Sequence, residues 1–157
     1  MIDRFVVVPA AYVILQRPSD DGTEVLLQLR QGTGFMDGHW ASAAAGHVEK
    51  GETAYDAAHR EAREEIGVED VALEFVTTMQ RTRSGEPIDE RIDFFFTARS
   101  WRGEPRNVEP DKAADLRWVA LTRLDELAEP VVPHERFVLD RLVTGMVAYT
   151  TFGFEES

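Results

Sequence analysis

The stretch from Gly46 to Val68 most constrains the fold, because it predicts a helix with both ends defined. Thr53 is followed three residues later by Asp56, a variant of the capping box that starts many helices. Gly67 suits the left-handed position that follows a helix C-terminus. We therefore expect a helix from about Thr53 to Ile66. Small and aliphatic residues recur along it at i, i+4 spacing, which lets a helix lie close against a sheet: Ala54, Ala58, Ala62 and Ile66.

Three glutamates lie close together on this predicted helix. Glu61, Glu64 and Glu65 are three and four residues apart, so their carboxylates share one face. Like charges at this spacing destabilise a helix by roughly 0.2–0.5 kcal/mol per pair. Two interpretations follow. The face is either solvated, with Arg60 and Arg63 compensating part of the charge, or built to hold a cation.

Composition narrows the class of protein. A chain of 157 residues that is 43% hydrophobic predicts one domain over residues 1–157. The absence of cysteine excludes a thiolate metal site and a cysteine nucleophile, and it fits a cytoplasmic protein. A net charge of -12 argues against binding to a nucleic-acid polymer. The longest apolar run, residues 5–15, is shorter than the roughly 20 residues that cross a membrane.

The rest of the chain predicts mainly strands. Two β-branched runs flank the turn-rich segment RPSDDGTE and predict a hairpin, and a second strand pair surrounds RSGEP. Apolar residues at helical spacing near the C-terminus predict a packed helix over 134–146. The final segment, AYTTFGFEES, has no pattern that predicts a structure. The predicted strands are residues 5–16, 25–30, 71–81, 92–98 and 116–119.

The spacing of glycines and charged residues around the helix resembles the Nudix box of the Nudix hydrolase superfamily. The matching residues are Gly46, five residues, Glu52, seven residues, Arg60-Glu61, two residues, Glu64-Glu65, one residue and Gly67-Val68. This match disfavours the solvated-face interpretation. The resemblance implies an α/β fold, an α/β/α sandwich with a mixed β-sheet. Two departures concern substrate fit and loop shape: Ala62 replaces a larger aliphatic residue, and AAAGH replaces the common Pro-Gly-Gly entry.

The resemblance also implies a chemistry. Glu61, Glu64 and Glu65 match carboxylates that bind a divalent metal and activate water, and the Ala45 carbonyl matches a further metal ligand. Glu52 and Arg60 match the pair that orients this cluster. Hard carboxylate oxygens suit Mg²⁺, with Mn²⁺ as the alternative.

The implied reaction is metal-dependent hydrolysis of a diphosphate bond in a small-molecule nucleotide. Residues 83–86 lack the proline and the tyrosine that accompany two other Nudix substrate classes, so elimination favours a nucleoside triphosphate giving nucleoside monophosphate and pyrophosphate. ADP-ribose or another nucleotide sugar is the alternative substrate. A nucleotide-sensing Nudix domain without catalysis is the alternative function, and the oligomeric state stays open.

Residues outside the box supply further candidates. Glu109 lies in a flexible-looking turn and could bind metal or act as a base, or be a solvated carboxylate. Arg30 ends a predicted strand and could bind phosphate, or be merely exposed. Trp118 could stack on a base, as could Trp40 and Phe35, although a core or rim role is the favoured interpretation of each. The four histidines have no metal-ligand spacing.

Overall fold

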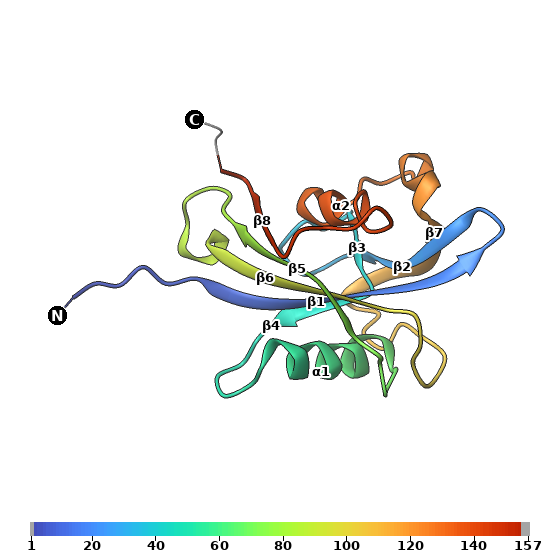
Figure 1. The fold of residues 1–157 in the computed structure, drawn as a ribbon, viewed down its shortest axis with the longest axis horizontal. Coiled ribbons are helices and arrows are strands. Elements are labelled where there is room, and N and C mark those ends of the chain that lie inside the picture. The colour runs from blue at the N-terminus through green and yellow to red at the C-terminus, as the bar shows by residue number, and fades with distance from the viewer. Residues whose placement is uncertain (1, 155–157) are drawn as a thin grey trace.

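The computed structural model describes residues 2–154 and is organised around one mixed sheet of eight strands (Figure 1). The strands are β1 (Val8–Ser19), β2 (Gly22–Arg30), β3 (Trp40–Ser42), β4 (Ala44–His47), β5 (Glu74–Arg81), β6 (Arg91–Ala98), β7 (Ala113–Ala120) and β8 (Tyr149–Phe152). The helices are α1 (Ala54–Ile66) and α2 (Pro133–Leu139), and the 3₁₀ helices are η1 (Pro87–Asp89) and η2 (Leu121–Glu126).

Strand β1 organises the sheet because it pairs with three neighbours. Its first half pairs antiparallel with β4, its end pairs antiparallel with β2 through a tight hairpin, and its other edge pairs parallel with β6. The strand order is β3-β2-β1-β6-β5-β8, with β4 paired to β1 and β7 paired to β2. All 12 residues of β1 take part in these pairings, and seven consecutive ones, Ala10 to Gln16, are buried.

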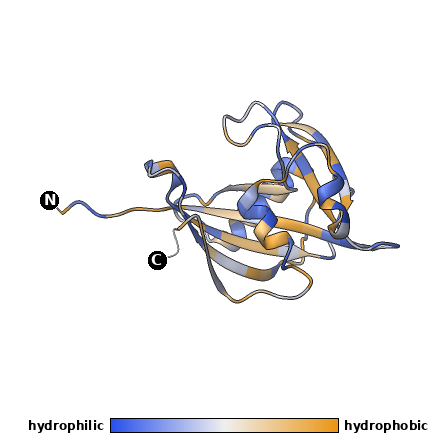
Figure 2. Cartoon of the chain, turned by 90° about the horizontal axis from the view of Figure 1, so that it is seen from above, coloured by the Kyte–Doolittle hydropathy of each residue, from blue (hydrophilic) through white to orange (hydrophobic). Residues whose placement is uncertain are grey.

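Each face of the sheet is covered by one helix. Helix α1 lies on one face and α2 on the other, as Figure 1 shows. The hydrophobic core is accordingly divided into two clusters, one under α1 and one under α2. Seen from the α2 side, the tip of the β1–β2 hairpin is hydrophilic whereas the middle of the sheet is largely hydrophobic (Figure 2). The predicted α/β/α sandwich with a mixed sheet is confirmed.

Helix α1 begins and ends where the sequence predicts. The Thr53 hydroxyl accepts a hydrogen bond from the Asp56 backbone N–H at 3.0 Å, and Gly67 takes the left-handed conformation with φ 68°. The helix buries Ala57, Ala58, Ala62 and Ile66 against the sheet. Ala62, the small residue at a position where the Nudix box usually has a larger one, is completely buried. A bigger side chain there would overpack this interface.

The C-terminal region differs from the prediction. Helix α2 ends at Leu139 rather than near residue 146, and residues 140–144 form turns. Gly145 has φ 94°, which an α-helix cannot accommodate, and Leu142 and Met146 reach the core from this irregular segment instead. The unassigned final segment contains β8, a four-residue strand parallel to β5. Alternation over so few residues gives too weak a periodicity to predict a strand.

Two further predictions concern the chain as a whole. The single domain predicted for residues 1–157 extends past both ends of the described range, and it stays a prediction. Among residues 2–154, no helix has the length and apolar character needed to cross a membrane.

A charged pair lies in the core beneath α2. Arg81 Nε donates to Asp93 Oδ2 at 2.7 Å, and these side chains are only 4% and 0% exposed. Tyr12 and His134 complete this buried polar group, with the Tyr12 hydroxyl 3.1 Å from His134 Nε2. Burial raises the pKa of Asp93, whereas the neighbouring guanidinium opposes that shift.

Replacing Asp93 with alanine should strongly destabilise the fold. The change leaves the Arg81 charge buried without a partner, which costs about 3–5 kcal/mol of unfolding free energy. As a control, Glu24→Ala removes the partner of the more exposed Arg17 and should cost at most about 1 kcal/mol. Urea denaturation of both variants measures the difference. Equal losses would show that the buried pair has no special role in stability.

Candidate active site

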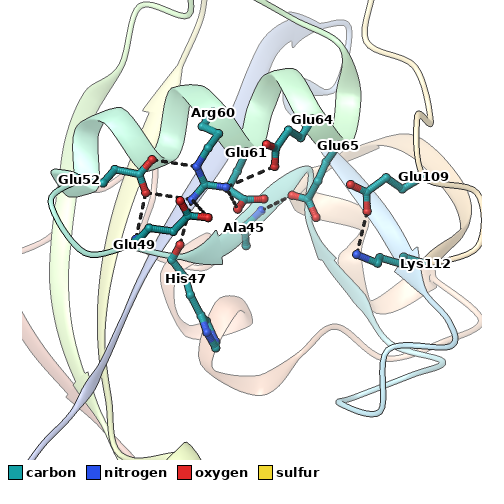
Figure 3. A network of polar contacts seen from close by, with 10 residues as sticks. All are labelled: Ala45, His47, Glu49, Glu52, Arg60, Glu61, Glu64, Glu65, Glu109 and Lys112. Atoms are coloured by element: carbon teal, nitrogen blue, oxygen red, sulfur yellow. Dashed lines mark hydrogen bonds and ion pairs between the residues drawn. The ribbon is translucent and has the colours of Figure 1, made fainter.

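The Arg60 guanidinium is the centre of a network on α1 (Figure 3). Its Nε and one terminal nitrogen donate to the two carboxylate oxygens of Glu52 at 2.8 and 2.9 Å. The other terminal nitrogen donates to Glu61 at 2.5 Å and to Glu64 at 3.3 Å. A further hydrogen bond goes to the His47 carbonyl at 3.0 Å. One arginine thus ties the loop before α1, the end of β4 and two of the clustered glutamates together.

Glu65 is held separately from this network. Its Oε2 accepts the Ala45 backbone N–H at 2.6 Å, which fixes the carboxylate against β4. Glu109 lies beside Glu65 in Figure 3 and forms an ion pair with Lys112 at 3.3 Å. The sequence predicted a flexible turn for Glu109. In the structure this loop is hydrogen-bonded to the C-terminal end of α1, with the Val108 N–H donating to the Glu65 carbonyl at 3.1 Å.

The glutamates in this cluster differ in the charge that they can carry. Hydrogen bonds from Arg60 lower the pKa of Glu52 to about 2. Burial raises the pKa of Glu61, although the Arg60 hydrogen bond opposes the rise. Burial also raises the pKa of Glu65 to about 8, and the charges of Glu61 and Glu109 add to that shift. Ionising Glu61 and Glu65 together is therefore unfavourable without a further cation.

Gly46 brings β4 into direct contact with this cluster. A Cβ atom added there would collide with the Glu61 carboxylate, including a contact of 2.8 Å with Oε2. Only glycine therefore lets the strand pass this close to the helix. The requirement is steric, because Gly46 is not among the residues with positive φ.

The donor atoms gathered here fit a divalent cation. Three carboxylates and the Ala45 carbonyl are hard oxygen ligands of the kind that Mg²⁺ binds, and Mg²⁺ retains several waters, so few protein ligands are needed. Within residues 2–154, no three carboxylate or imidazole side chains already converge as a ready-made metal site. Arg60 lies between Glu61 and Glu64 in this arrangement. The fit therefore rests on the chemistry and charge of the donors.

A cavity of about 500 Å³ is lined by Glu135 of α2 and by Ala45, Gly46 and His47 of β4, and none of the clustered glutamates is among its lining residues. Strand β4 forms a shared wall, because Gly46 contacts the Glu61 carboxylate on one side and lines the cavity on the other. A ligand in this cavity could therefore extend past Gly46 to the glutamates.

Arg30 and Phe35 both line this cavity. Arg30 Nε donates to the Phe35 carbonyl at 2.8 Å, and a terminal nitrogen donates to Thr33 Oγ1 at 2.9 Å. Asp37 closes the same loop by accepting from the Gly34 N–H at 2.9 Å, and hydrogen bonding from Thr33 lowers the pKa of Asp37. Arg30 is thus held in place at the cavity wall, and its proposed contact with substrate stays a prediction.

The two candidate tryptophans, Trp118 and Trp40, do not line this cavity. Trp118 is not among the cavity-lining residues; it stacks on Trp101 with ring centroids 6.0 Å apart, and Arg17 lies 4.1 Å from its ring centroid. Trp40 is completely buried, and its indole N–H donates to Glu129 at 3.1 Å. These positions match the core or rim role that the sequence offered as the alternative to stacking on a base.

Sequence reasoning missed three arginines in the cavity lining. Arg81 and Arg91 are directly opposite each other on β5 and β6, and Arg83 follows β5. The signal was available, because a hairpin around RSGEP pairs the arginines on its two sides. Sequence reasoning also missed Glu135, a buried residue of α2 that lines the same cavity. No sequence pattern indicated that Glu135 would be buried, because glutamates on short helices are mostly exposed.

Gly46→Ala should weaken metal binding without unfolding the protein. The added Cβ displaces the Glu61 carboxylate, and moving a ligand or its support costs about 10- to 100-fold in metal affinity. Gly51→Ala is the control, because Gly51 has φ 83° but no atom within 4 Å of an added Cβ. That variant should lose some stability and keep its affinity. Calorimetric Mg²⁺ titration of both variants tests this; unchanged affinity in Gly46→Ala would exclude the steric role.

Comparisons with known proteins agree with this geometry. The NUDIX domain family matches residues 7–142. The chain is 34% identical over 120 residues to an isopentenyl-diphosphate Delta-isomerase of Cereibacter sphaeroides, covering 74% of this chain and 66% of that protein's length. It is 29% identical over 129 residues to the uncharacterized Nudix hydrolase YvcI of Bacillus subtilis, covering 81% of this chain and 75% of the relative.

Among solved structures, the MutT NUDIX hydrolase from Burkholderia pseudomallei superposes with a TM-score of 0.69 at 25% identity, covering 85% of this chain and 98% of that one. Residues 7–142, which match the NUDIX domain family, contain the whole sheet except β8, together with both helices. The chain belongs to the NUDIX domain family.

Proposed function

We propose that the protein hydrolyses a diphosphate bond in a nucleoside triphosphate, releasing nucleoside monophosphate and pyrophosphate, with Mg²⁺ as cofactor and Mn²⁺ as the alternative. The main support is the shared wall at Gly46, where a cluster of glutamates meets a cavity able to hold a small molecule. A nucleotide in the cavity would thereby bring its phosphates to the glutamates.

Each residue of the cluster has a separate role in this proposal. Glu64, Glu65 and the Ala45 carbonyl hold the metal together with Glu61. Bound metal supplies positive charge that offsets the charge on the phosphates and acidifies water. Arg60, anchored by Glu52, keeps the Glu61 carboxylate in place. Pre-organised groups of this kind lower the barrier because they need no rearrangement during the reaction.

The hydrolytic step moves one proton and exchanges one bond at phosphorus. The water oxygen bonds to the phosphorus of the nucleoside monophosphate unit while the bridging P–O bond to the leaving pyrophosphate breaks. Glu61 accepts the water proton in this proposal. Glu109 has an auxiliary role at the metal, since it lies next to Glu65 on a loop already attached to α1.

The charge of the cavity supports an anionic substrate. The chain has a net charge of -12, yet the lining includes Arg30, Arg81, Arg83 and Arg91 against two carboxylates, Asp89 and Glu135. Arg81 lies opposite Arg91 in the sheet, but its charge is already paired with Asp93. Arg91 Nε is buried and has no hydrogen-bond partner within residues 2–154. A phosphate group would supply the missing acceptor for Arg91.

Isomerisation of isopentenyl diphosphate is a second candidate, favoured by the 34% identity to the Cereibacter sphaeroides isomerase. Such a substrate places a short hydrocarbon chain beyond its diphosphate. The cavity here instead presents charged groups from several elements, including Arg81 and Glu135. Arg91 Nε, in the same lining, has no hydrogen-bond partner within residues 2–154, and burying it against hydrocarbon would be costly. Hydrolysis is therefore the proposal that the cavity supports better.

Product analysis distinguishes these functions. With Mg²⁺ and a panel of nucleoside triphosphates, we expect pyrophosphate and nucleoside monophosphate by ion-exchange chromatography, and no double-bond isomer from isopentenyl diphosphate. Rapid cleavage of ADP-ribose with no turnover of any triphosphate would move the substrate to the nucleotide sugars. Tight nucleotide binding with no turnover of any compound would support a sensing domain.

Substituting the metal-binding glutamates should abolish most activity. Glu64→Gln or Glu65→Gln removes a charge that positions the metal, and we expect turnover to fall at least about 100-fold. Folding should be retained, because each change removes one partner from a repulsive pair. Glu69→Gln is the control, since Glu69 lies just beyond the helix, is half exposed and pairs with Arg102. Turnover within threefold of wild type in both site variants would contradict the metal assignment.

Kinetics should separate Glu61 from Glu109 as the proton acceptor. If Glu61 accepts the proton, Glu61→Gln lowers kcat severely even at saturating Mg²⁺. Glu109→Gln should then mainly raise the concentration of Mg²⁺ or substrate required. The reverse pattern, with kcat lost only in Glu109→Gln, would place the base on the loop.

A further inference from the structure

One wall of the cavity is arranged around a single residue of β3, Ser42. Its backbone N–H donates to Glu135 Oε1 at 2.8 Å, and its carbonyl accepts from Gln28 Nε2 at 3.1 Å. Gln28 Nε2 also donates to the Ala43 carbonyl at 3.3 Å. The two side chains come from α2 and β2, which are far apart in the sequence. Their attachment to one residue fixes them as neighbours on the cavity wall.

These hydrogen bonds leave acceptor atoms without partners. Gln28 uses its amide nitrogen for two carbonyls, and neither its Oε1 nor Glu135 Oε2 accepts a well-aligned hydrogen bond within the described residues. The buried Ser42 hydroxyl lies close to the Glu135 carboxylate and opposes the rise that burial causes in the pKa of Glu135, although the two do not form a well-aligned hydrogen bond. Glu135 is only 3% exposed. Buried polar atoms are nearly always hydrogen-bonded, so an unsatisfied group in a cavity wall indicates a missing partner.

The missing partner must be a hydrogen-bond donor. An ionised carboxylate accepts only, and an amide oxygen accepts only, so both residues offer acceptors on the same cavity wall. An acceptor on the ligand would be repelled from this position. The structure accounts for the anchoring of both side chains, and a donor from the ligand would also favour the ionised form of Glu135, whose pKa burial raises.

We propose that Glu135, Gln28 and Ser42 form a specificity wall that reads the hydrogen-bonding edge of the nucleobase and selects a base with adjacent amino and ring N–H donors. This inference rests on the proposed function for the nucleotide itself. Guanine has that edge. Adenine and cytosine place an acceptor nitrogen beside the amino group, and uracil flanks its one N–H with two carbonyls. Hypoxanthine keeps the guanine ring N–H but lacks the amino group.

Phe35 supplies a surface on which the selected base could stack. Its ring lies in the cavity wall between two guanidinium groups, with Arg30 and Arg83 each 5.5 Å from the ring centroid. Stacking on an aromatic ring is tolerant of base identity, whereas hydrogen bonds to the edge are selective. Discrimination should therefore be sensitive to Glu135 and insensitive to the stacking surface.

The test compares guanosine monophosphate with inosine monophosphate, which differ only in the amino group. Binding by calorimetry needs no turnover, so it remains informative whatever the catalytic activity. We expect the wild type to bind guanosine monophosphate about 10- to 100-fold more tightly, the range for one hydrogen bond to a charged group. Glu135→Gln should reduce that preference to about threefold or less, because the amide can turn a donor toward the base.

One control and one further variant make the result decisive. Glu126→Gln changes a carboxylate in η2 that is largely exposed and outside the cavity, and it should leave the preference unchanged. Ser42→Ala keeps the backbone anchors, so it serves as a second variant if Glu135→Gln does not fold, and it should lower the preference.

Equal wild-type affinity for the two monophosphates, or an unchanged preference in Glu135→Gln, would overturn the specificity wall. A retained guanine preference without hydrolysis of any triphosphate would instead refute only the proposed function.

Discussion

The site depends on how the Arg60 guanidinium distributes one positive charge among several carboxylates. Its two hydrogen bonds to Glu52 anchor it to the loop before α1, and the remaining contacts reach Glu61 and Glu64. One cation cannot neutralise all of them. Glu65 receives only the Ala45 N–H, and its pKa is raised to about 8 by burial and by neighbouring charges. Full ionisation of the cluster is thus unfavourable in the folded chain unless a further cation is bound.

The sheet places the glutamate cluster and the cavity on opposite sides of one strand. Strand β4 passes between the glutamates and the cavity, and Gly46 allows that approach because any side chain would collide with Glu61. On the far side the lining contains arginines, two of which face each other across β5 and β6. An acidic cluster and a basic cavity separated by one strand suit a metal-bound phosphate substrate, because each side attracts a different component of that complex.

Prediction from the sequence succeeded where a local signal had one physical meaning. The cap residues of α1 depend on helix geometry alone, so Thr53 and Gly67 were predicted correctly. The length of α2 was not, because apolar spacing continues past Leu139 although Leu142 and Met146 reach the core from turns. Short parallel β8 depends on pairing with β5, a contact far away in the sequence.

The residues of the cavity wall could not be predicted from local sequence patterns for the same reason. Glu135 and Gln28 become neighbours only when α2 and β2 both contact Ser42 in the folded chain. Trp118 illustrates the opposite case, since a tryptophan on a strand is consistent with either base stacking or core packing. Its stacking on Trp101 is set by the tertiary arrangement. Residue types therefore identified the carboxylate cluster, whereas the residues proposed to select a substrate required the structure.

The central claim is that a divalent cation completes the folded state of the acidic cluster, and the Mg²⁺ dependence of the unfolding free energy tests it most directly. A ligand that binds only the folded state stabilises it by about 2.7 kcal/mol at 100 times its dissociation constant. Salt alone also relieves charge repulsion by screening, so the comparison must use NaCl at matched ionic strength. The account predicts saturable stabilisation by Mg²⁺ beyond the NaCl effect. Identical unfolding free energies in Mg²⁺ and matched NaCl would contradict it.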